Sequence, residues 1–123
     1  MPDGTSAAEL LEWADNALSD GDGLPPGVWQ HAAALLARRS LERALDEMWR
    51  TRAPGLEARP ARYQLLCLPA YVDADLAGRT SHVWWSLNNA SRHHPYELAP
   101  TASELRGWLA TVTEVVDALN VTG

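Results

Sequence analysis

The chain has one cysteine and no lysine, isoleucine or phenylalanine among its 123 residues. A single cysteine, Cys67, excludes a disulfide framework within the chain and a zinc site built from several thiolates. Leucines surround it in the sequence, so we interpret it as a small buried apolar residue. The preference for arginine, alanine and leucine is typical of a GC-rich bacterial coding sequence, such as an actinobacterial one.

Long apolar runs and a basic leader are also missing. No stretch approaches the ~20 apolar residues that a membrane-spanning helix needs, and the first residues lack the basic-then-apolar pattern of a signal peptide. We therefore expect a cytoplasmic protein that does not enter membranes. A single domain over residues 1–123 is the default at this length, with Met1–Thr5 flexible.

The net charge of −6 is unevenly distributed along the chain. Residues 1–24 carry six acidic side chains and no basic one, whereas residues 25–62 carry seven arginines against four acids. A general nucleic-acid binder presents a basic face that releases counterions from phosphates. The sequence offers at most a local basic face around the second helix, which we interpret as a solvated helix face of mixed charge. DNA binding is therefore not expected.

Helical periodicity and helix-start signals predict about five helices. Capping boxes precede the first and the last of them, at residues 6–9 and 101–104. The first helix is expected to end near Ser19, the second to span about 28–52, the third to run from residues 59–60 to Pro69, and the fourth to start after Asp73 and run towards Ser91. Strand-like alternation is absent, so we expect an all-α, compact up-and-down bundle.

The long second helix has apolar residues on more than one face, which predicts a central position with several neighbours. Arg38 and Glu42 are four residues apart and are expected to pair on its solvent side. The first helix is expected to dock through Leu10, Trp13, Ala14 and Leu18. The third is expected to bury Tyr63, Leu66, Cys67 and Ala70.

The adjacent residues Trp84 and Trp85 point roughly 100° apart on a helix. We therefore expect one of the two rings to lie at a surface or an interface.

Polar side chains with ligand-binding chemistry cluster in residues 88–97. Imidazoles titrate near neutral pH, and a guanidinium can hold phosphate with two N–H groups. The candidate phosphate- or RNA-binding residues are Asn88, Asn89, Arg92, His93, His94 and Glu97.

Two other roles compete for the same segment. In a structural role, the imidazoles would satisfy helix-end carbonyls and Arg92 would pair with Glu97. In a metal-binding role, His82, His93, His94 and Glu97 would be the ligands, but adjacent histidines diverge and no histidine pair has helical i, i+4 spacing. We expect neither a metal nor a cofactor.

The layout resembles the HEPN superfamily of prokaryotic helical domains. The similar features are the amphipathic first helix, the Ala-Arg-Arg-Ser-Leu-Glu-Arg-Ala-Leu run at residues 37–45, and an Asn- and His-bearing end of the fourth helix before a capped last helix. The resemblance implies a homodimer. Ribonuclease members of the superfamily carry a motif of Arg and a polar residue, followed after about four to six residues by His. Two such motifs face each other across the homodimer and cleave RNA without metal.

This chain departs from that motif at its first position. Asn88 stands where the arginine would be, Asn89 is the polar companion, and four residues separate Asn88 from His93. An amide has no permanent charge to stabilise a developing phosphorane. We therefore favour a non-catalytic module that binds a protein partner, a nucleotide or RNA. The alternatives are a metal-independent endoribonuclease of defence or toxin–antitoxin type and a metal-binding helical bundle.

The six tryptophans and the many-sided second helix predict self-association, because these apolar groups exceed what a small core can cover. Sedimentation at micromolar concentration should therefore give a species of twice 13.5 kDa. A single species at 13.5 kDa would contradict the predicted homodimer.

Overall fold

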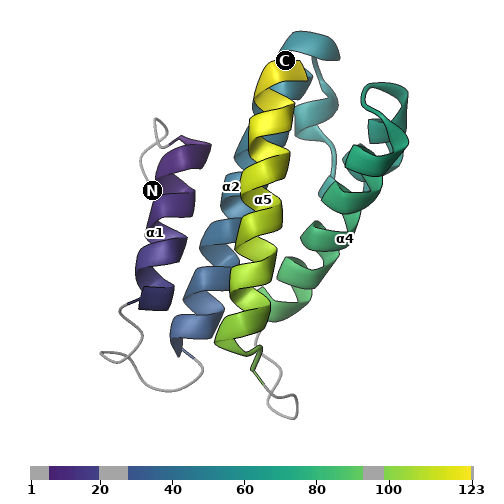
Figure 1. Ribbon diagram of the computed structural model, residues 1–123. Coiled ribbons are helices and arrows are strands. Elements are labelled where there is room, and N and C mark those ends of the chain that lie inside the picture. Colours follow the sequence, from purple (N-terminus) through teal and green to yellow (C-terminus); the bar gives the residue numbers. More distant parts are fainter. Residues whose placement is uncertain (1–5, 20–27, 93–98, 123) are drawn as a thin grey trace.

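The computed structural model describes residues 6–19, 28–92 and 99–122, and these residues are mostly helical with no strand among them. The predicted all-α class is thus confirmed, whereas residues 1–5 lie outside the described ranges. Four longer helices run alternately down and up (Figure 1). They are α1 (Ala7–Ser19), α2 (Val28–Arg52), α4 (Ala74–Ser91) and α5 (Ala102–Thr122). Between α2 and α4 lie a 3₁₀ turn η2 (Leu56–Ala58), the short helix α3 (Ala61–Cys67) and a second 3₁₀ turn η3 (Leu68–Ala70).

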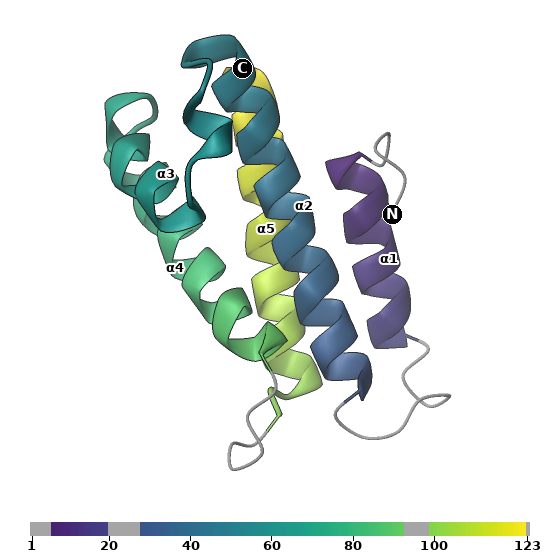
Figure 2. The same ribbon diagram turned by 180° about the vertical axis from the view of Figure 1, so that it is seen from behind.

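Helix α2 is the centre of the bundle, as predicted. It packs against α1, α4 and α5, and views from opposite sides show it between α1 and α4 (Figures 1 and 2). Its buried positions are rich in alanine, which lets neighbouring backbones approach closely. They are Ala33, Ala34, Ala37, Ser40, Leu41, Ala44, Leu45, Met48 and Trp49.

The helix starts match their sequence signals. The Thr101 hydroxyl accepts the Glu104 backbone N–H at 3.1 Å, and the Glu104 carboxylate accepts the Thr101 backbone N–H at 3.1 Å, which is a complete capping box. The Ser6 hydroxyl accepts the Glu9 backbone N–H at 3.1 Å. Asp73 caps α4, because its carboxylate accepts the backbone N–H of Leu76 at 2.8 Å.

The buried side of α3 differs from the prediction. Tyr63 is 50% exposed and Leu66 is 80% exposed, whereas Gln64 and Leu65 face the core. Ala70 is also exposed, and Cys67, expected to be buried, is only partly so. A buried polar contact explains this rotation: the indole N–H of Trp49 donates to Gln64 Oε1 at 3.0 Å, and the Gln64 amide donates to the Arg59 carbonyl at 2.8 Å. A glutamine with both ends satisfied can occupy a core position.

The expected burial of Trp13 is wrong, since this side chain is 41% exposed. The other three predicted contacts are confirmed, because α1 packs through Leu10, Ala14 and Leu18, together with Ala7. Ala14 is completely buried, so α1 approaches its neighbours through a small residue. Trp13, the preceding residue, points about 100° away from Ala14 around the helix. The prediction for the tryptophan pair is confirmed: Trp84 is buried and Trp85 is 45% exposed.

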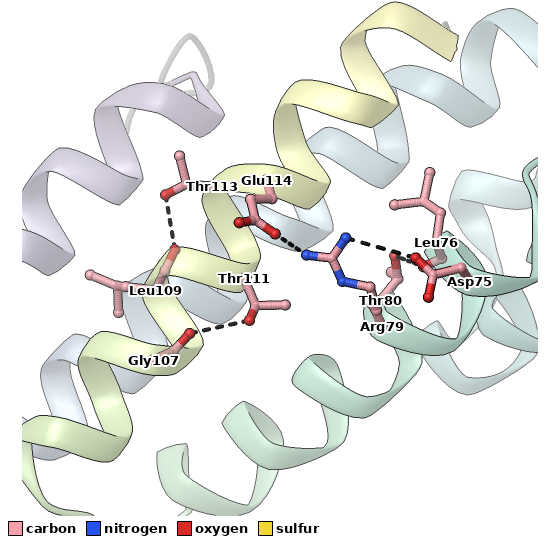
Figure 3. A network of polar contacts seen from close by, with 9 residues as sticks. All are labelled: Asp75, Leu76, Arg79, Thr80, Gly107, Leu109, Thr111, Thr113 and Glu114. Atoms are coloured by element: carbon pink, nitrogen blue, oxygen red, sulfur yellow. Dashed lines mark hydrogen bonds and ion pairs between the residues drawn. The ribbon is translucent and has the colours of Figure 1, made fainter.

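Polar contacts also join neighbouring helices outside the apolar core. Arg79 on α4 pairs with Glu114 on α5, and its Nη1 lies 3.9 Å from Asp75 Oδ2 (Figure 3). The buried Ser40 hydroxyl donates to the Ala7 carbonyl at 2.7 Å, which ties α2 to the start of α1. None of the helices within the described ranges has the length and apolar character needed to cross a bilayer.

The contrast between Trp49 and Trp13 gives a matched test of this packing. Trp49 is fully buried, with its ring edge-on to Tyr71 at a centroid distance of 5.1 Å. Trp49→Ala should lower the free energy of unfolding by about 3–5 kcal/mol through the cavity it leaves, whereas Trp13→Ala should cost less than about 1.5 kcal/mol. Equal losses in urea denaturation would contradict the described position of α1.

Candidate functional site

A cluster of polar side chains lies between α2 and α4. The Nη1 of Arg38 donates to Asn88 Oδ1 at 3.2 Å and to Ser91 Oγ at 2.9 Å. Glu42, one turn along α2, accepts the indole N–H of Trp84 at 3.2 Å. We call these five residues the Arg38 cluster; they join one stripe of α2 to one stripe of α4.

The position of Arg38 corrects the expectation of a pair on the solvent side. Its Nε does lie 3.9 Å from Glu42 Oε1, but the side chain is only 21% exposed and points towards α4. Two polar stripes can be partly buried against each other when each provides hydrogen-bond partners for the other. Asn88 and Ser91 supply neutral acceptors there, and Glu42 supplies the compensating charge.

The Nε atom of Arg38 is buried and has no hydrogen-bond partner among the described residues. It interacts with Glu42 only across the 3.9 Å separation. A guanidinium has five donors, and this cluster satisfies its Nη1 side better than its Nε side. The arginine is therefore held by α4 more firmly than by its own helix.

The sequence-predicted site residues divide into three groups. Asn88 is buried in the Arg38 cluster, and its side-chain oxygen faces α2. Asn89 and Arg92 are exposed at the end of α4, where the Arg92 backbone N–H donates to the Asn89 carbonyl at 3.3 Å. The remaining residues lie outside the described ranges, as does the predicted Arg92–Glu97 pair; they are His93, His94 and Glu97.

The predicted metal-ligand set also falls largely outside the described ranges, since only His82 of the four is described. Within residues 6–19, 28–92 and 99–122, no three His, Cys, Asp or Glu side chains gather as metal ligands could.

A second candidate site, missed by the sequence analysis, is a cavity of about 500 Å³ between α3 and α4. We call it the α3–α4 groove. The sequence indicated this groove only through the adjacent Trp84 and Trp85, because one of their two rings was expected to face outward. The lining residues are Arg59, Pro60, Arg62, Tyr63, Leu65, Leu66, Ser81 and Trp85.

A carboxyl with a shifted pKa lies on α2, apart from the lining of the groove. Burial raises the pKa of the Asp46 carboxyl, and the positive charge of Arg50 partly offsets this effect. Glu42, one turn earlier on α2, adds like-charge repulsion that raises the same pKa. Asp46 therefore belongs to the electrostatics of α2 and lines neither candidate site.

The fold and the site define an all-α up-and-down bundle with a charged cluster between two of its helices. Comparison with protein-family models, with curated proteins and with solved structures finds no match for this chain.

The Arg38 cluster can be tested by a double-mutant cycle. Arg38→Met should lower the free energy of unfolding by about 2–3 kcal/mol, because it leaves buried acceptors unpaired. Arg38→Met with Asn88→Leu should cost less than the sum of the two single changes, with a coupling of about 1–2 kcal/mol. Arg39→Met is the control on the exposed neighbouring position. Strict additivity would show that Arg38 and Asn88 do not interact.

Proposed function

We propose that the chain is a small, non-catalytic binding module of HEPN-like type that acts as a homodimer and holds RNA or a nucleotide at the C-terminal end of α4. The observation that carries the non-catalytic part is the position of Asn88. This residue stands where the ribonuclease motif has arginine, yet its side chain is buried and accepts a hydrogen bond from Arg38. An amide engaged inside the bundle is not available to an RNA phosphate.

Binding at the end of α4 is supported by the two exposed predicted residues. Asn89 follows Asn88 on the helix, and Arg92 directly follows its last residue. A guanidinium gives phosphate a charge-assisted, two-pronged contact, and an amide can add a neutral donor. Because Arg92 is exposed, it can reach a ligand without disturbing the core.

Self-association is supported by a large apolar group on the surface. Trp13 on α1 is 41% exposed and lies outside the α3–α4 groove. Tryptophan is enriched at protein interfaces, where it covers a large area with little loss of side-chain entropy.

A metal-independent ribonuclease is the second candidate, and one contact favours it. The Arg38 guanidinium lies 3.2 Å from Asn88 Oδ1, so a permanent positive charge from α2 stands beside the position where the motif lacks one. In this alternative Arg38 would stabilise the developing negative charge and His94 would transfer the proton.

The binding proposal predicts a selective effect of Arg92. Fluorescence anisotropy with a labelled single-stranded RNA at low salt should show binding that Arg92→Gln weakens by about tenfold, as expected for loss of a charged contact. Arg106→Gln, which removes an exposed arginine from α5, should leave the affinity nearly unchanged. Both variants should unfold within about 0.5 kcal/mol of the parent. Equal affinities for the two variants would contradict the site.

The same RNA separates the two candidate functions. The proposed module should leave the RNA intact in the presence of excess chelator. Cleavage that persists with the chelator and disappears in His94→Ala would contradict the non-catalytic module and support the ribonuclease.

A further inference from the structure

The α3–α4 groove is built from two walls of aromatic and apolar side chains. Tyr63 and Leu66 stand on α3, and Trp85 stands on α4 with Ser81 one turn before it. The cavity volume of about 500 Å³ lies in the range of sites for small organic ligands. Helix α3 has seven residues and is only about 10 Å long, which is short for docking a partner helix along several turns.

Contacts beneath the groove hold both walls in place. On α3, Gln64 binds Trp49 in the core, so Tyr63 and Leu66 must face outward. On α4, the Trp85 ring lies edge-on to Trp84, with ring centroids 4.9 Å apart. Trp84 in turn is held by its hydrogen bond to Glu42. Walls fixed in this way reduce the entropy lost when a ligand binds.

The charge of the groove is positive although the chain is acidic overall. Arg59 and Arg62 line it, and no carboxylate is among its lining residues. The Arg59 guanidinium lies 5.9 Å from the Tyr63 ring centroid, which keeps it beside an aromatic face. Neither arginine has an ion-pair partner within the described part of the chain. The groove thus offers two guanidinium groups to an anion.

We propose that the α3–α4 groove binds a free nucleoside monophosphate. The base would lie against Tyr63 and Trp85, where any nucleobase can stack, and the phosphate would lie at Arg59 and Arg62. A phosphate monoester carries a charge of about −1.5 to −2 at neutral pH, which matches two guanidinium groups. This inference is independent of the proposed site at the end of α4, because neither Asn89 nor Arg92 lines the groove.

The test is a calorimetric titration of the full chain with AMP, adenosine and ribose 5-phosphate. AMP should bind, and the two fragments should each bind at least about tenfold more weakly, because adenosine lacks the phosphate and ribose 5-phosphate lacks the base. Arg62→Gln and Trp85→Leu should each weaken AMP binding by about tenfold or more. The matched controls, Arg106→Gln and Trp13→Leu, should bind AMP like the parent chain.

The inference would be overturned if AMP did not bind at millimolar concentration, or if groove and control variants bound AMP equally. It would also be overturned if 5′-phosphorylated RNA bound and AMP did not, or if a synthetic acidic peptide of residues 6–19 occupied the groove and AMP did not. The Arg92→Gln variant separates the two sites. RNA binding that depends on Arg92, together with AMP binding that does not change in Arg62→Gln, would contradict the groove as the AMP site and leave the site at the end of α4 in place. AMP binding at the groove with no RNA binding would remove the site at the end of α4 alone.

Discussion

The guanidinium of Arg38 enters the space between α2 and α4, where a charged group must find acceptors because little water can reach it. Asn88 and Ser91 supply them from α4, and Glu42 balances the charge. With Asn88 turned towards α2, the residue that follows it on α4 turns about 100° away. The part-buried contacts of Asn88 and Trp84 therefore set the rotation of α4, and their respective neighbours Asn89 and Trp85 face outward.

A similar constraint acts on α3. The indole N–H of Trp49 is buried and needs an acceptor, which Gln64 provides. That contact rotates the short helix so that Tyr63 and Leu66 face solvent opposite Trp85. The α3–α4 groove thus depends on two polar contacts, the buried Trp49–Gln64 bond beneath α3 and the part-buried Trp84–Glu42 bond beneath α4. The exposed aromatic rings are a consequence of satisfying hydrogen bonds in the core.

Much of the bundle was predictable from local sequence signals. The bounds of α2, the caps at Asp73 and Thr101 and the break at Pro69 follow from residue chemistry within a few positions. The errors at Trp13, Tyr63 and Leu66 came from assigning large apolar residues to the core. On α1 the predicted Leu10, Ala14 and Leu18 cover the core without Trp13, and on α3 a hydrogen-bonded glutamine holds the core position.

The candidate site was less predictable, because it depends on contacts between distant parts of the chain. Spacing along α2 correctly paired Arg38 with Glu42 but could not place Asn88, which is 50 residues away in sequence. The sequence indicated Asn88 as a candidate site residue, but its hydrogen bond with Arg38 depends on how α2 and α4 pack together. The groove has the same origin, since its two walls come from different helices.

Hydrogen exchange at the indole N–H groups of Trp84 and Trp85 tests the central claim most directly, because these neighbours differ only in which way α4 is turned. The Trp84 indole, bound to Glu42 in the Arg38 cluster, should exchange slowly, whereas the half-exposed Trp85 indole should exchange rapidly. Arg38→Met should accelerate exchange at Trp84 and leave Trp85 unchanged. Equally fast exchange at both indoles in the parent chain would contradict a buried polar contact that fixes α4 against α2.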